Sequence, residues 1–204
     1  MRLISWARDR GQTNYRPPSR LRKLYKSDRA EKIWLRADIA AFREAASEPL
    51  WQALVLALET GQRQGDLIRL PWSAYDGQWI KLKQSKTGMN VAIPVSRDLR
   101  LTIETLPTNS PVMLTSSQGR PWTSDGLRTS WYKAAKRAGI KDLTFHDLRG
   151  TAVTRLAEAG CTEAEIAAIT GHSLKSVGAI LDRYLARTKG LALAAMAKLE
   201  KSRS

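Results

Sequence analysis

The chain contains two histidines, and the first lies in a motif whose residue types suit the binding of an anion. The motif is Thr144-Phe145-His146-Asp147-Leu148-Arg149, at the expected start of a helix. His146 and Arg149 are three residues apart, so their side chains lie on one helix face, near the positive end of the helix dipole. A phosphate group suits this corner. A capping and packing motif in which Arg149 pairs with Asp147 or another acid explains the same spacing.

Further residues with chemical potential stand in turns or on helices elsewhere in the chain. His172 follows a glycine between two expected helices, a dozen residues before Tyr184. Arg63 lies in a turn after an apolar helix, with Asp66 three residues later, where Asp66 can orient Arg63 or cap the next helix. Lys86 lies in the connection of an expected hairpin. Each signal alone also fits a structural role, such as a solvated cation in a turn or a partly buried histidine.

The elements that must position these residues are mainly helical. Apolar periodicity and capping signals predict helices at residues 2–10, 37–46, 48–59, 64–70, 97–105, 125–138, 146–159, 163–170, 174–185 and 191–201. Alternation over 79–83 and 90–95, around a turn-rich connection, predicts a β-hairpin, and residues 112–114 a short strand. The sequence therefore predicts a mainly α fold with a small antiparallel β-sheet.

Local signals refine three of these helices. Gly61 suits the C-cap of the helix before it, and Thr162-x-x-Glu165 has the spacing of a capping box, with Thr144-x-x-Asp147 as a variant. Trp122 and Trp131 are expected in the core rather than as platforms on which bases stack.

The charge balance indicates a polyanionic partner. Lys and Arg total 34 against 19 Asp and Glu, which gives a net charge of +15 and a pI near 10.4. Such a surplus attracts polyanions, of which nucleic acid is the commonest. An anionic membrane is the weaker alternative, because no segment has the basic amphipathic character of an interfacial anchor.

The composition also argues against several other classes of protein. The single cysteine, Cys161, allows neither an internal disulfide nor a cysteine-built zinc site. A metal hydrolase is a poor fit, because the two histidines are 26 residues apart and no acidic cluster accompanies them. No stretch approaches the ~20 apolar residues of a membrane span, and the N-terminus lacks the apolar run of a signal peptide. We therefore expect a cytoplasmic protein.

Taken in chain order, the candidate residues resemble the signature of the tyrosine recombinase (phage integrase) family. That signature is Arg, Lys in a β-hairpin, His-x-x-Arg, His or Trp, and then Tyr. Five blocks match it in wording: Thr60-Gly61-Gln62-Arg63 with Asp66, Ser85-Lys86-Thr87-Gly88, His146-Asp147-Leu148-Arg149, Gly171-His172-Ser173 and Asp182-Arg183-Tyr184-Leu185. The resemblance extends from about Leu35 to Leu199, and six functional positions in order make chance agreement improbable.

The resemblance implies a fold, an activity and a role for each residue. The fold would be that of DNA breaking-rejoining enzymes, and the reaction would be site-specific recombination through a covalent 3′-phosphotyrosine. The implied roles are phosphate binding for Arg63 and Arg149, proton transfer with the nucleophile Tyr184 for His146, a hydrogen bond to the phosphate for His172, protonation of the 5′-oxygen for Lys86, and support of Arg63 for Asp66. No metal and no cofactor is implied.

The resemblance also implies a domain organisation and partners. Residues 1–30 would be the last helix of an N-terminal core-binding domain with its linker, and residues 31–204 the catalytic domain with a tail helix that packs in cis or on a neighbouring protomer. The partner would be double-stranded DNA, bound by a homotetramer, with a monomer or weak dimer in its absence. Because half of the DNA-enclosing assembly would then be missing, full recombination by these residues alone is not expected, whereas covalent cleavage is compatible with them.

Two other functions remain open from the sequence. A type IB topoisomerase shares the order of catalytic residues but relaxes supercoils, which a plasmid relaxation assay detects. A catalytically idle integrase remnant would bind DNA without cleaving it.

Overall fold

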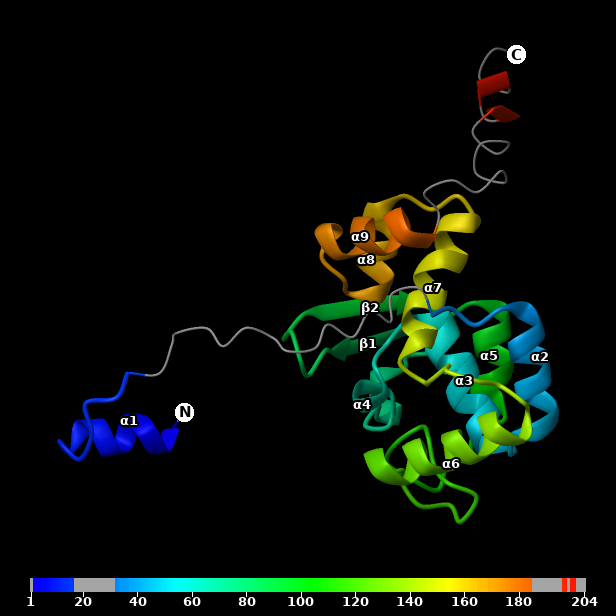
Figure 1. The fold of residues 1–204 in the computed structure, drawn as a ribbon. Helices are drawn as coiled ribbons and strands as arrows, with labels where there is room; N and C mark the ends of the chain where they lie inside the picture. Colours follow the sequence, from blue (N-terminus) through cyan, green and yellow to red (C-terminus); the bar gives the residue numbers. More distant parts are fainter. Residues whose placement is uncertain (1, 17–31, 185–195, 198, 201–204) are drawn as a thin grey trace.

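A computed structural model describes residues 2–16, 32–184, 196–197 and 199–200 (Figure 1). In chain order its elements are α1 (Arg2–Asp9), α2 (Arg36–Ala45), α3 (Glu48–Thr60), α4 (Gln64–Leu67), the short 3-10 helix η1 (Trp72–Ala74), β1 (Trp79–Lys83), β2 (Asn90–Pro94), α5 (Arg97–Glu104), α6 (Ser124–Arg137), α7 (Asp147–Glu158), α8 (Glu163–Thr170) and α9 (Leu174–Tyr184). The mainly helical fold with one small antiparallel sheet is confirmed. The bounds of the expected helices agree to within a few residues.

A cluster of aromatic rings forms the centre of the main hydrophobic core. Trp34, Phe42, Trp131 and Phe145 are each at most 5% exposed, and their ring centroids lie 4.3 to 5.6 Å apart, mostly edge to face. The cluster joins α2 and α6 to the segments before α2 and α7. It confirms the expectation that Trp131 is a core residue, and Trp122 packs at the margin of the same core.

Helix α7 connects the two hydrophobic clusters of the described structure. Leu148, near its start, belongs to the main core, whereas Val153 and Ala157 pack with Ile166 of α8 and Val177 of α9. Figure 1 shows α7 running from the helical body toward α8 and α9, with the hairpin beside this junction. The candidate functional residues gather at the junction.

The expected hairpin is confirmed, and its two strands pair antiparallel. Ile80 lies opposite Ile93, and Leu82 lies opposite Val91. Ile80, Val91 and Ile93 are buried, whereas their neighbours along the strands face outward or are less buried. Alternation with a period of two therefore attaches one face of the hairpin to the core.

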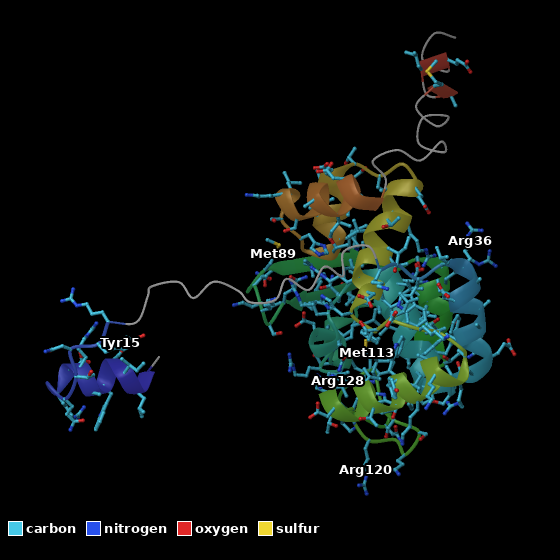
Figure 2. The ribbon with its side chains drawn as sticks, viewed as in Figure 1. Tyr15, Arg36, Met89, Met113, Arg120 and Arg128 are labelled. Carbon is cyan, nitrogen blue, oxygen red and sulfur yellow. The ribbon has the colours of Figure 1, made fainter. Side chains whose placement is uncertain are left out.

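The short strand expected at 112–114 is wrong. Val112 forms only an isolated bridge with Pro71, and the Met113 amide donates to the carbonyl of Leu70 at 2.9 Å. Pro71 has no amide hydrogen, so a ladder cannot extend on that side. Met113 and Leu114 are nevertheless fully buried, whereas Arg120, in the loop that follows them, points away from the body of the molecule (Figure 2).

Other expectations concern the two ends of the chain. The helix expected at 2–10 is confirmed as α1, with Leu3 and Trp6 exposed. Most of the expected linker and tail helix lies outside the described residues. Among the described residues, no helix is long and apolar enough to cross a membrane.

The aromatic cluster predicts a large effect of truncation. Replacing Phe42 by Ala should lower the free energy of unfolding by roughly 3–5 kcal/mol, because it removes a fully buried ring and leaves a cavity. Replacing Tyr132, which is 67% exposed on α6, by Ala should change it by less than about 0.5 kcal/mol. Urea unfolding followed by tryptophan fluorescence measures both. A Phe42→Ala variant as stable as the parent would contradict the packing described.

Candidate active site

Arg149 lies where two helices end. Its side chain is 4% exposed, and its Nη1 donates to the main-chain carbonyl of Gly61, which caps α3, and at 2.7 Å to that of Thr170, the last residue of α8. The negative ends of two helix dipoles therefore face the cation. In the described structure, the guanidinium does not form the ion pair with Asp147 that the sequence offered as a structural alternative. The Asp147 carboxylate accepts from the backbone and hydroxyl of Thr144, as a capping residue does.

The second guanidinium nitrogen of Arg149 has no partner. Nη2 is buried and makes no hydrogen bond in the described structure. Burial is the largest cause that lowers the pKa of Arg149, to about 9; Arg63 lowers it further and Asp66 raises it. Arg149 is still cationic at neutral pH, but its charge is poorly compensated. A buried donor on a cation without an acceptor is costly, and an anion would provide the missing acceptor.

Arg63 lies between α3 and α4, at the N-cap of α4, and is held mainly by a residue of the hairpin. Its Nη1 donates to Oε1 of Gln84 at 2.8 Å, whereas Oδ2 of Asp66 lies at 4.0 Å, the limit of an ion pair. Oδ1 of Asp66 instead accepts from the backbone amide and the hydroxyl of Ser85, at 2.9 and 2.7 Å. Asp66 therefore fixes the start of the hairpin loop as well as standing beside Arg63.

The loop that carries Lys86 is tied at both of its sides. Ser85 is bound to Asp66, and the hydroxyl of Thr87 donates to Oε1 of Gln84 at 2.8 Å. Gly88 has a φ of +70°, which closes the turn in a conformation that glycine adopts readily. Lys86 itself, between the bonded residues Ser85 and Thr87, is exposed. Its long side chain can therefore contact a ligand that binds at the surface.

The hydrogen bonds around His172 assign its tautomer. Its Nδ1 lies 2.9 Å from the hydroxyl of Thr170, and that hydroxyl already donates to the carbonyl of Ile166 at 2.7 Å. The hydroxyl must therefore accept, so Nδ1 carries the proton and Nε2 of the neutral ring carries none. Burial, followed by the charges of Arg149, Arg63 and His146, lowers the pKa of His172 to about 3.

His146 lies in the same positive field. It precedes α7 at the N-cap position and is exposed at the rim of the site. Loss of water around the ring is the largest cause that lowers the pKa of His146; Asp147 opposes it, and Arg149, Arg63 and Lys86 add to it. The two histidines and the three cations expected from the sequence thus come together electrostatically, although they lie in four separate segments of the chain.

Tyr184 is the last residue of α9. Its helix packs on α7 and α8, which carry Arg149 and lead into His172, so the backbone of residue 184 belongs to the same part of the molecule. The tyrosine side chain lies outside the described residues.

Sequence reasoning did not identify two residues of the site. Gln84 is fully buried and bonds to Arg63, and Thr170 is fully buried and bonds to both Arg149 and His172. A signal for Gln84 existed. The alternation that buries Ile80 and turns Lys83 outward places residue 84 on the inner face, where an amide needs buried partners. Thr170 carried no comparable signal.

Two further features of the described part of the chain concern metal ligands and cavities. Its residues include no group of three or more His, Cys, Asp or Glu side chains that could hold a metal ion. A hollow of about 1000 Å³ between α2, α3, α5 and α7 lies elsewhere, since none of the six candidate catalytic residues lines it. Within the cation cluster, Lys86 and His146 are exposed, whereas Arg149 is buried.

Known proteins resemble this chain along most of its length. The sequence profile of the phage integrase family matches residues 26–189. The shufflon-specific DNA recombinase of Escherichia coli is 37% identical over 120 residues, which cover 57% of this chain and 30% of that protein. The chain spans about a third of the length of the curated relatives that it matches first.

Solved structures share the fold. The lambda integrase catalytic core superposes with a TM-score of 0.62 and 26% identity, over 69% of this chain and 91% of that one. A lambda integrase tetramer bound to a Holliday junction gives a TM-score of 0.62 with 25% identity, over 83% of this chain and 55% of that one. With the profile matching most of its residues, the chain belongs to the phage integrase family of tyrosine recombinases.

Proposed function

We propose that this chain cleaves and rejoins double-stranded DNA in site-specific recombination, through a covalent 3′-phosphotyrosine at Tyr184. The observation that carries the proposal is the buried, unpartnered Nη2 of Arg149 within a cluster of basic side chains. Such a group is suited to one phosphate oxygen. We infer the type of reaction from the order of the basic residues along the chain and from the family membership.

Arg63 and Arg149 bind the two non-bridging oxygens of the scissile phosphate. Guanidinium groups suit two-point contacts with phosphate. Arg63 lies just after the C-terminal end of α3, and Arg149 donates to the carbonyl of Gly61 at that end. Since their positions are fixed by hydrogen bonds before DNA binds, they stabilise the charge that grows on these oxygens during attack without a further cost of reorganisation.

Tyr184 attacks the phosphorus and His146 accepts its proton. A phenol with an ordinary pKa of about 10 is a weak nucleophile at neutral pH, so a base beside it accelerates the step. The lowered pKa of His146 keeps this ring neutral at pH 7 and able to accept the proton. The new bond joins the phenol oxygen to phosphorus, and the bond between phosphorus and the 5′-oxygen breaks.

Lys86 donates a proton to the departing 5′-oxygen. An alkoxide is a poor leaving group, so an acid at this position contributes to the rate. The anchored loop brings the ammonium to the site, and its exposure allows the side chain to follow the DNA backbone. A 5′-hydroxyl from a partner strand reverses the step, and because the phosphotyrosine conserves the energy of the bond, no ATP is needed.

His172 contributes a hydrogen bond to the phosphate once it is protonated. Its neutral form offers only a lone pair at Nε2, which a phosphate oxygen repels. A bound anion offsets the positive charges that lower the pKa of His172. We therefore infer that DNA binding favours the cationic ring, whose Nε2 then donates to the phosphate.

The full recombination reaction needs more than one copy of the protein. A lambda integrase has been solved as a tetramer bound to a Holliday junction, and we propose a tetramer on DNA here as well. Because the chain spans about a third of its curated relatives, strand cleavage is the part of the reaction assigned to it here.

Covalent trapping tests the proposed chemistry. A duplex that binds tightly, selected from random sequences, is nicked near the cleavage point so that the released fragment diffuses away. The wild-type chain should form a protein–DNA adduct that survives a denaturing gel. The variant Tyr184→Phe should form none, because it lacks the nucleophilic oxygen.

A matched variant controls for loss of a phenol elsewhere. Tyr132→Phe alters an exposed tyrosine on α6, and it should trap as much DNA as the wild type. An adduct that persists in Tyr184→Phe would contradict the assignment of the nucleophile. Tight binding by the wild type without any adduct would instead favour an idle DNA-binding protein.

The state of His172 predicts how stability depends on pH. The folded protein keeps this ring neutral down to a pKa of about 3, whereas the unfolded chain takes up a proton near pH 6.5. Below pH 6.5 the unfolded state therefore binds more protons, and stability falls as the pH falls. One such group contributes at most about 1.4 kcal/mol per pH unit, and partial exposure of the ring reduces this.

Urea unfolding at pH 7.5 and pH 5.0, without DNA, measures the effect. His172→Gln, which cannot take up the proton, should lose less stability between these two values than the wild type. Equal losses in both proteins would show that His172 is not held neutral by the fold.

A further inference from the structure

Gln84 is a fully buried amide at the end of β1, and every one of its hydrogen-bonding groups is used. Its Oε1 accepts from Nη1 of Arg63 and from the hydroxyl of Thr87, both at 2.8 Å. Its Nε2 donates to Oε1 of Gln62 at 2.7 Å and to the carbonyl of Thr170 at 2.9 Å. An amide offers two donors and two acceptor lone pairs, so this pattern admits a single orientation of the side chain.

The partners of Gln84 belong to the segments that carry the candidate catalytic groups. Arg63 is itself such a group, and Thr87 is next to Lys86 in the hairpin loop. The carbonyl of Thr170 also accepts from Arg149, and its hydroxyl holds His172. One amide thus connects segments that are 21 and 86 residues away in the sequence.

The Gln84 amide packs closely against Gly171, at the end of α8. A Cβ added to Gly171 would lie 2.3 Å from Nε2 of Gln84 and 2.9 Å from a methyl group of Val91. Gly171 also has a φ of +66°. The residue after α8 therefore has no room for a side chain against the Gln84 amide, and the hydrogen bond from Nε2 to Thr170 holds the amide at this helix end.

Asp66, the acid beside Arg63, is not placed to replace Gln84 as the hydrogen-bond acceptor of the guanidinium. Oδ2 of Asp66 is 4.0 Å from the guanidinium, beyond hydrogen-bonding distance, and Oδ1 is occupied by Ser85. The Gln84 amide is neutral, so it holds Arg63 without adding to the negative charge that Asp66 already places at 4.0 Å.

We propose that Gln84 is a positioning residue, whose amide orients the guanidinium of Arg63 toward the scissile phosphate. The inference rests on the proposed function and extends it to a residue outside the family signature. Gln84 does not touch DNA; it acts through Arg63. Its loss therefore slows cleavage more than it weakens DNA binding, because the surplus of positive charge persists while the transition-state contact is misplaced.

The test compares two buried glutamines replaced by methionine, which has a similar shape and no strong hydrogen bonds. Gln84→Met removes the acceptor of Arg63. Gln52→Met is the matched control, since Gln52 is 5% exposed and, among the described residues, its side chain bonds to Thr105 and to none of the candidate residues. Thermal melts, DNA affinity and the single-turnover rate of adduct formation are measured for each.

Both variants should lose stability, but only Gln84→Met should lose cleavage rate, by about 10- to 100-fold, with DNA affinity changed by less than about threefold. In an Arg63→Lys background, which lacks the planar guanidinium, the same substitution should cost less than about threefold, because its target is gone. Gln84→Glu keeps an acceptor for Arg63, but its carboxylate adds negative charge beside Arg63 and turns an oxygen toward the carbonyl of Thr170, so it too should cleave at least about tenfold more slowly than the wild type. It also serves as the second variant if the methionine variant does not fold.

Three results would overturn the inference alone while leaving the proposed function intact. They are a Gln84→Met variant that cleaves like the wild type, an equal rate loss in the Arg63→Lys background, and an equal rate loss in Gln52→Met. A wild-type chain that forms no adduct would overturn the proposed function and this inference with it.

Discussion

The burial of the Arg149 guanidinium without a bonded acid is the interaction on which the site depends. A cation removed from water needs compensation, and here the carbonyl groups of Gly61 and Thr170, at the ends of α3 and α8, provide part of it. Nη2 is left without an acceptor. The folded chain thus holds a buried cation that two helix ends orient, and in the proposed function a phosphate oxygen is the acceptor for Nη2. In such a site, the folded structure already holds the hydrogen-bond donors of the guanidinium in place before a ligand binds.

Two glycines make this convergence of helix ends sterically possible. Gly61 and Gly171 cap α3 and α8 with φ values of +63° and +66°, a conformation that costs other residues energy. A Cβ at Gly61 would lie 2.7 Å from a methyl group of Thr170. The turns after the two helices then carry Arg63 and His172, while α7 brings Arg149 between the two hydrophobic clusters. The close approach of the two helix ends therefore also determines where these three side chains lie.

The sequence predicted the elements well, because apolar periodicity and caps are local signals. The helices from α2 to α9 and the hairpin follow from such patterns, and Gly61 was recognisable as a cap. The order of basic residues indicated the family, yet no local signal showed that Arg149 bonds to carbonyl groups rather than to Asp147. Residues 112–114 failed as a strand because a proline stands opposite. Gln84 was missed because its partners lie in distant segments.

A structure of the chain bound to a DNA duplex tests the central claim most directly. We predict that a non-bridging oxygen of one phosphate lies within hydrogen-bonding distance of Nη2 of Arg149, that the Arg63 guanidinium contacts the same phosphate, and that the hydroxyl of Tyr184 faces its phosphorus. Duplex DNA bound to another face, with Nη2 of Arg149 still buried and without an acceptor, would contradict the account.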